Sequence, residues 1–154
     1  MAGITIGVAS ETARGERRVA LTPETCRKLV ARGAIVRVER GAGRHSAFTD
    51  EAYADAGAEL VDNAAAALRD AELVLCVQPP ASSTLMSLRP GAALVGLLAP
   101  QADPTRGEAI NARNLIAFPL ERLPRTTRAQ AMDVLSSQAG MAGYKAVLIA
   151  AQLA

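Results

Sequence analysis

The densest group of polar side chains in this sequence lies between Arg125 and Gln138. Gln130, Asp133 and Ser136 occupy every third position, so a helical or 3₁₀ turn would place all three on one face. An amide, a carboxylate and a hydroxyl on one face could recognise a flat polar group, and Arg125 would add positive charge nearby. A solvated helix face has the same spacing, so spacing alone does not decide between the two interpretations.

A second charged group, Arg14-Gly15-Glu16-Arg17-Arg18, follows the first apolar run of the chain. In an open parallel sheet such a loop lies at the carboxyl edge, where ligands bind. We expect Arg18 to be the residue that could bind a carboxylate there. The alternative is a surface loop held by its own salt bridges, and the sequence leaves both open.

The pattern Gly41-x-Gly43-x-x-Ser46 is similar at first sight to a dinucleotide-binding fingerprint. The third glycine, which allows close helix–strand packing, is missing. Asp50 and Glu51 open the next predicted helix and would repel a pyrophosphate at its N-terminus. We therefore expect an ordinary turn here, and a chain without its own cradle for nucleotide phosphates.

Other catalytic chemistries have little support in the sequence. His45 is the only histidine, which excludes a Ser-His-Asp triad and a site with several histidine ligands. Cys26 and Cys76 lie far apart in apolar stretches, as buried thiols of a reducing compartment do. We expect no metal site and no disulfide.

Composition indicates one globular domain. Of its residues, 50% are hydrophobic and 21% are charged, as in an ordinary globular protein. A length of 154 residues is too short for a dinucleotide-binding domain plus a separate substrate domain. The net charge of +2 is scattered and aromatic residues make up 3%, which argues against nucleic-acid binding. The apolar run 146–154 falls short of the ~18 residues of a membrane-spanning helix. We expect a cytoplasmic chain that does not itself insert into a membrane.

Short apolar runs alternate with helical segments along the chain, which predicts right-handed crossovers and a mostly parallel sheet. The expected fold is a flavodoxin-like, doubly wound α/β domain with helices on both faces. The last helix lacks a C-cap glycine and stops within an apolar pattern, so we expect it to continue or to pack on something else. Strands are expected at 4–9, 34–38, 59–61, 73–77, 94–98 and 115–118, and helices at 22–32, 49–56, 64–69, 104–112 and from Gln138 or Met141 to Ala154.

The sequence resembles the N-terminal domain shared by alanine dehydrogenase and the NAD-binding alpha subunit of proton-translocating NAD(P) transhydrogenase. The resemblance covers essentially all 154 residues, although it corresponds to well under half of a full family member. It rests on residues 6–12 and 16–23, Gly41-Ala42-Gly43, Phe48-Thr49-Asp50, Ala56-Gly57-Ala58, the segment from Pro124 to Gln138, and Ala142-Gly143-Tyr144-Lys145-Ala146.

The two branches of this family differ at a few positions. Alanine dehydrogenases carry two lysines where this chain has Cys76 and Gln78, and a histidine near the position of Ala99. A neutral amide and a methyl group cannot transfer protons at neutral pH. The Val-Gln-x-Pro block and the segment 124–138 instead have the transhydrogenase form. This chain departs from that form at Thr126-Thr127, where the family usually has Ile-Ser, and at Cys76, where it usually has Lys.

The resemblance implies an oxidoreductase that moves a hydride from NADH to NADP⁺, coupled to proton passage through a membrane partner. It places Arg125, Gln130 and Asp133 in the catalytic site, and these three with Ser136 around the nicotinamide of NAD(H). It also implies NADP-binding and membrane-spanning partner components, a homodimer of complete alpha subunits, and a location on the inner face of the cytoplasmic membrane.

In a full family member, residues 1–137 would form the N-terminal domain and residues 138–154 would begin a helix leading to a Rossmann domain. Without that domain, we expect this chain to be inactive alone and to bind NADH weakly. We also expect an apolar face of the last helix to be exposed, where it could pair with another copy. Two alternatives stay open: an amino-acid dehydrogenase of the alanine or saccharopine type, and a free-standing, non-catalytic interaction domain.

Overall fold

A six-stranded sheet forms the centre of the computed structural model, which describes residues 3–124 and 126–153. All five strand pairings are parallel, in the order β3-β2-β1-β4-β5-β6. The expected doubly wound α/β sheet is thus confirmed, but its strand order is that of the Rossmann fold and not the flavodoxin-like order. The strands are β1 (Thr5–Val8), β2 (Ile35–Glu39), β3 (Glu59–Val61), β4 (Leu73–Leu75), β5 (Ala93–Gly96) and β6 (Ile116–Pro119).

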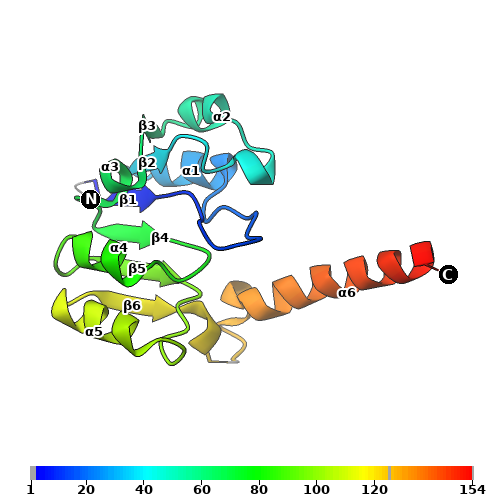
Figure 1. Cartoon of the computed structure of the whole chain (residues 1–154). Coiled ribbons are helices and arrows are strands. Elements are labelled where there is room, and N and C mark those ends of the chain that lie inside the picture. Colours follow the sequence, from blue (N-terminus) through cyan, green and yellow to red (C-terminus); the bar gives the residue numbers. More distant parts are fainter. Residues whose placement is uncertain (1–2, 125, 154) are drawn as a thin grey trace.

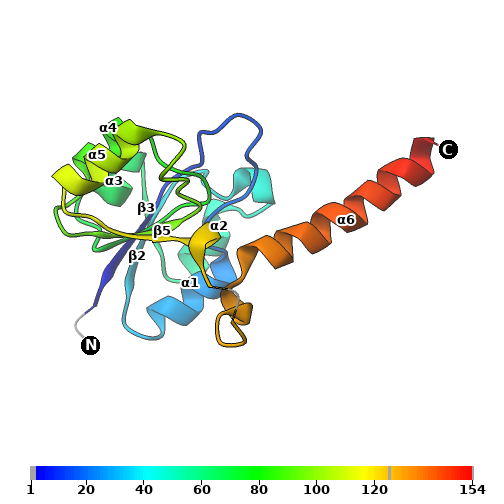
Figure 2. The ribbon, with the colours of Figure 1, turned by 90° about the horizontal axis from the view of Figure 1, so that it is seen from below.

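Helices cover both faces of the sheet (Figures 1 and 2). On one face, α1 (Pro23–Val30) and α2 (Asp50–Asp55) pack on a core that contains Ile6, Val8 and the fully buried Tyr53. On the other face lie α3 (Ala64–Leu68), α4 (Ser82–Ser87) and α5 (Pro104–Ala112), over a core that contains Val74, Leu85 and Leu94. Because α3 runs back across β2 and β1, the next strand, β4, pairs with β1 and sets the Rossmann order.

The close approach of α3 to β1 depends on a glycine. Side chains alternate along a strand, so Ile6 and Val8 face α1 while the position between them faces α3. A Cβ at Gly7 would lie 2.5 Å from the carbonyl oxygen of Ala67 and 3.0 Å from the Cβ of Ala71. A side chain at this position would therefore push α3 off the sheet.

Most helices begin where the sequence predicts, because a side chain caps the N-terminus. The hydroxyls of Thr22 and Thr49 accept hydrogen bonds from the first-turn amides of α1 and α2, and Asp103 caps α5. Helix α4 is missing from the expected elements. It has six residues and an alanine at its N-cap, without a side-chain capping bond, so it carries no start signal in the sequence.

Helix α6 (Val134–Leu153) projects away from the domain (Figure 1). It begins earlier than the expected Gln138 or Met141, because the Asp133 carboxylate caps its first turn. No helix in residues 3–124 and 126–153 is long and apolar enough to cross a membrane. The expected apolar exposure is observed along α6, at Met141, Tyr144, Val147, Leu148, Ile149 and Leu153.

Candidate functional site

The polar segment, of which residues 126–138 are described, follows β6 at the carboxyl edge of the sheet, after the 3₁₀ turn η2 (Leu120–Arg122). Its three regularly spaced residues do not share one helix: Gln130 lies on the 3₁₀ turn η3 (Gln130–Met132), Asp133 is extended, and Ser136 lies in the first turn of α6. The structure nevertheless brings all three to one pocket of about 610 Å³. Arg125, the fourth predicted site residue, lies outside the described residues. Thr126, Thr127, Ala129 and Leu135 also line this pocket, which we call the segment pocket.

Asp133 and Ser136 act as one hydrogen-bonded unit in the segment pocket. Asp133 Oδ1 accepts from the backbone N–H groups of Leu135 (3.0 Å) and Ser136 (3.1 Å). The Ser136 hydroxyl donates to Asp133 Oδ2 at 2.6 Å, which leaves Ser136 Oγ to accept a hydrogen bond. With the amide of Gln130 alongside, the pocket can both donate to and accept from a planar polar group. This arrangement suits binding and orientation of a ligand.

Arg18 is held by its own loop. Its Nε and Nη2 bind the two oxygens of Glu16 at 2.8 and 2.6 Å, and this pairing holds the pKa of Glu16 well below its usual range. Glu16 Oε2 also accepts from Gln78 Nε2 at 2.8 Å. Arg18 Nη1 donates to Gln138 Oε1 at 3.0 Å, across to α6. Of the two interpretations of Arg18, the structure favours the loop held by its own salt bridge.

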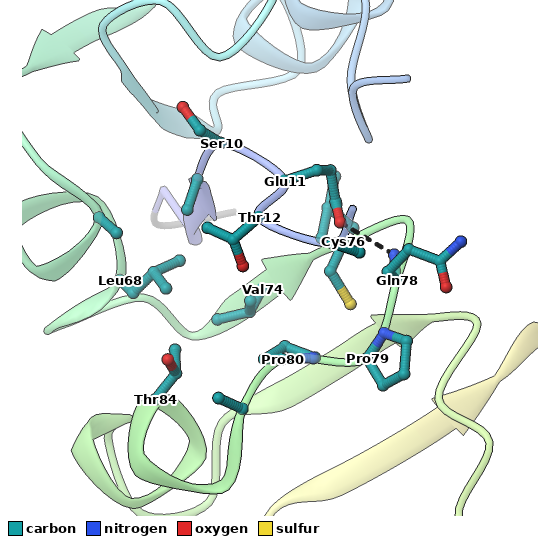
Figure 3. Close-up of a pocket in the computed structure, with 15 residues that line it drawn as sticks. Ser10, Glu11, Thr12, Leu68, Val74, Cys76, Gln78, Pro79, Pro80 and Thr84 are labelled. Carbon is teal, nitrogen blue, oxygen red and sulfur yellow. Dashed lines mark hydrogen bonds between the residues drawn. The ribbon is translucent and has the colours of Figure 1, made fainter. Parts of the chain in front are cut away.

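A second pocket, of about 270 Å³, lies where the sheet order changes direction, between the carboxyl ends of β1 and β4 (Figure 3). Ligands of open α/β sheets bind in such crevices. Here the carboxylate of Glu11 accepts hydrogen bonds from the backbone N–H groups of Val77 (2.5 Å) and Gln78 (3.0 Å). The chain's own anion therefore takes the amides that could hold a bound anion.

The glycine turn after β2 shows the same use of a carboxylate. The backbone N–H of Gly41 donates to Asp50 Oδ1 at 2.8 Å, so it is engaged within the chain. This bond supports the interpretation of the Gly41-x-Gly43 pattern as a structural turn. At both of these turns, a carboxylate of the chain itself thus accepts from the backbone amides.

Three strand-end glutamates have roles that sequence reasoning missed. Glu39 accepts from the backbone N–H of Ser10 (2.7 Å), and Glu11 binds the end of β4 as described above. Glu121 accepts from the backbone N–H groups of Leu98 (3.2 Å) and Ala99 (2.6 Å), at the end of β5. Their only common sequence signal is a glutamate at or soon after the end of a strand.

Cys76 occupies the position where the resemblance predicts lysine. Burial raises the pKa of its thiol to about 12, with Glu11 and Glu121 adding to the shift, so the side chain is neutral. A Cβ at Gly96 on the neighbouring strand would lie 2.5 Å from its Sγ, which shows how closely the thiol packs on β5. Within residues 3–124 and 126–153, no cluster of His, Cys, Asp and Glu side chains could hold a metal ion.

Residues 7–142 match the family described as "Alanine dehydrogenase/PNT, N-terminal domain". An NAD(P) transhydrogenase subunit alpha polypeptide of Rhodospirillum rubrum is 40% identical over 148 residues, covering 93% of this chain and 38% of that protein. Alanine dehydrogenase of Bacillus subtilis is 34% identical over 147 residues, covering 96% of this chain and 38% of that protein.

A solved structure, the transhydrogenase from Sinorhizobium meliloti, superposes with a TM-score of 0.89 at 38% identity. The superposition covers 96% of this chain and 42% of that one. This chain thus spans about two fifths of the length of the relatives it matches.

Proposed function

The chain belongs to the alanine dehydrogenase/PNT N-terminal domain family, and we propose that it serves as the N-terminal part of the NAD(H)-binding alpha subunit of a proton-translocating NAD(P) transhydrogenase. The observation that carries this proposal is the segment pocket, where Gln130, Asp133 and Ser136 lie together. The higher identity to the transhydrogenase subunit than to alanine dehydrogenase supports the choice of branch.

The reaction passes a hydride from NADH to NADP⁺, so NADH becomes NAD⁺ and NADP⁺ becomes NADPH. No proton needs to be added or removed at the rings, and the main task of the protein is to orient them. Ser136 Oγ is an acceptor suited to the N–H groups of a carboxamide, because its own proton is donated to Asp133. In this proposal Gln130 and Ser136 orient the nicotinamide, while Asp133 and Arg125 set the local field.

Binding of the cofactor's phosphates falls to another region of the subunit in this proposal. The carboxylates of Glu11 and Asp50 accept from the backbone amides at the β1–β4 crevice and at the Gly41 turn, so these amides are engaged within the chain. We therefore propose that residues 1–137 form the nicotinamide-facing domain and that residues 138–154 lead toward a Rossmann domain. The share of the relatives' length that this chain covers supports that organisation. Alone, the chain should bind NADH weakly and be inactive.

The proposal extends to partners and location. The relatives named subunit alpha indicate assembly with other subunits. We propose NADP-binding and membrane-spanning partner components, a homodimer of complete alpha subunits, and a position on the inner face of the cytoplasmic membrane.

An amino-acid dehydrogenase is the second candidate, because alanine dehydrogenase of Bacillus subtilis is 34% identical. In such an enzyme, side chains at the end of β4 would transfer protons. Here these side chains are the amide of Gln78, which is bound to Glu16, and the neutral thiol of Cys76. Neither side chain exchanges a proton readily at neutral pH. A chimera that joins this chain to the remaining part of the Bacillus subtilis alanine dehydrogenase should therefore not oxidise alanine. Measurable turnover of alanine with NAD⁺ by this chimera would favour the second candidate.

Titration of the ¹⁵N-labelled chain with reduced nicotinamide mononucleotide tests the proposed site. We expect weak binding, with a dissociation constant on the order of millimolar, since most affinity would come from the missing phosphate contacts. The amide shifts should concentrate at Gln130, Asp133 and Ser136, and AMP should leave these signals unchanged. Shifts confined to the Gly41–Gly43 turn, or micromolar binding of NADH by the chain alone, would contradict the proposal.

A further inference from the structure

We infer that two hydrogen-bonded ties, from Glu121 at one end and from Arg18 to Gln138 at the other, position the segment that carries Gln130, Asp133 and Ser136. Glu121 and Arg18 are then positioning residues for the proposed nicotinamide site. These hydrogen bonds hold the segment whatever it binds, and only their effect on nicotinamide binding rests on the proposed function.

The first tie joins η2, from which the segment departs, to the end of β5. Glu121 accepts from the backbone N–H groups of Leu98 and Ala99 at 3.2 and 2.6 Å. Arg106 Nη1 donates to the carbonyl oxygens of the same two residues at 3.1 and 3.2 Å. Ala99 has a φ of 40°, a left-handed backbone conformation that is unfavourable for a residue with a Cβ. The two charged side chains thus fix the peptides on which η2 rests.

The second tie joins the first turns of α6 to the loop after β1. Arg18 Nη1 donates to Gln138 Oε1 at 3.0 Å. The guanidinium is a fixed donor, because Glu16 holds it through two further bonds and the Glu16 side chain is only 7% exposed. Gln78 holds Glu16 in turn, so the tie reaches the end of β4. Helix α6 is thereby linked to the centre of the sheet edge.

The ties matter because a pocket separates the first turn of α6 from the sheet. This pocket, of about 510 Å³, is distinct from the segment pocket but shares Leu135 with it. Where this open pocket lies, the side chains of α6 and of the strand ends make fewer close contacts than they would across a filled interface. The side chains of Arg18, Glu121 and Gln138, which make the ties, line this pocket. Its apolar lining includes Val19, Phe48, Leu97, Leu120 and Val134.

Short-range hydrogen bonds shape the segment from within. The backbone N–H groups of Thr126, Ala129 and Met132 each donate to a carbonyl two or three residues earlier. Bonds of this kind set local turns within the segment. The bonds of Glu121 and of Arg18 to Gln138, by contrast, join its two ends to the sheet edge.

Amide hydrogen exchange of the chain tests the ties without any ligand. We expect Glu121→Ala to speed exchange at Leu98 and Ala99 and across residues 126–137 by about tenfold or more, as loss of a hydrogen bond to a charged group implies. Glu121→Gln keeps one acceptor and should restore part of the protection. Gln138→Ala, which suits a helix, should speed exchange in the first turn of α6. Glu39→Ala is the matched control, because it removes a similar carboxylate tie at Ser10.

Reduced nicotinamide mononucleotide supplies a readout that a purely structural role would not move. Glu121→Ala should weaken its shifts at Gln130 and Ser136, while Glu39→Ala, at a similar melting temperature, should leave them unchanged. Wild-type exchange rates over 126–137 in both Glu121→Ala and Gln138→Ala would overturn the inference. If the wild-type chain shows no nicotinamide shifts at all, the proposed function fails, and the exchange rates still decide on the ties.

Discussion

Replacing Asp133 separates its structural role in α6 from its proposed role at the nicotinamide. Asp133 Oδ1 accepts from two first-turn amides, at 3.0 and 3.1 Å, so an alanine there leaves both without a cap. Loss of such an N-cap destabilises the start of a helix by about 1 kcal/mol, which corresponds to roughly fivefold faster exchange of the capped amides. Asparagine keeps the oxygen that accepts from these two amides and puts an amide donor in place of Oδ2, the acceptor of the Ser136 hydroxyl. Its loss of charge weakens the start of an exposed helix by about 0.3–0.6 kcal/mol.

Amide exchange followed by NMR measures this difference residue by residue. Asp133→Ala should raise the exchange rates of Leu135 and Ser136 about fivefold, and Asp133→Asn by no more than about threefold. Leu148 and Ile149, farther along α6, should exchange at the wild-type rate in both variants. Equal rates in the alanine and asparagine variants would refute the capping role, as would an unchanged rate at Ser136 in Asp133→Ala.

Three further predictions concern the core. Gly7→Ala should lower the free energy of unfolding by about 1–3 kcal/mol in urea, because its Cβ would meet the Ala67 carbonyl, whereas Gly107→Ala in α5, with open space around it, should raise that free energy by up to about 1 kcal/mol. Tyr53→Phe should cost about 1–2 kcal/mol at pH 7, since the buried Leu21 carbonyl loses its 2.6 Å donor. Burial raises the pKa of Tyr53 to about 12, so its neutral form stabilises the fold fully below pH 10, and the difference between wild type and Tyr53→Phe should shrink as pH rises from 10 to 12; a difference that grows there would contradict this. Cys76, with its pKa raised to about 12, should react with iodoacetamide at pH 8 more than tenfold slower in the folded chain than in urea, and equal rates would refute its burial.

The fold was largely predictable because its signals are local. Alternating apolar runs and capping residues such as Thr22 and Thr49 act within a few positions, so they place the strands and most helices. Helix α4 lacks a capping side chain and could not be recognised in this way. The strand order could not be predicted either, because it depends on which face α3 crosses, a tertiary choice that leaves no pattern in the sequence.

The sequence predicts that Gln130, Asp133 and Ser136 lie together, but not the local geometry that brings them together. The spacing of Gln130, Asp133 and Ser136 predicts one shared face, and the structure brings them together through a 3₁₀ turn, an extended residue and a helix start. The ties of Glu11 and Glu121 connect residues 66 and 23 positions apart in the sequence. Contacts of that range arise from the folded sheet edge, so single-residue patterns cannot reveal them.

Hydride transfer by a chimera tests the central claim most directly. In this chimera the chain replaces the matching N-terminal region of the Rhodospirillum rubrum NAD(P) transhydrogenase subunit alpha polypeptide, which is then assembled with its partner subunits. We predict that the chimera forms NADPH from NADH and NADP⁺, that Gln130→Ala and Asp133→Asn each lower kcat by about tenfold or more with a smaller change in KM for NADH, and that Glu39→Ala has the wild-type kcat. A folded, NADH-binding chimera that transfers no hydride, or one whose kcat is unchanged by both site substitutions, would contradict the account.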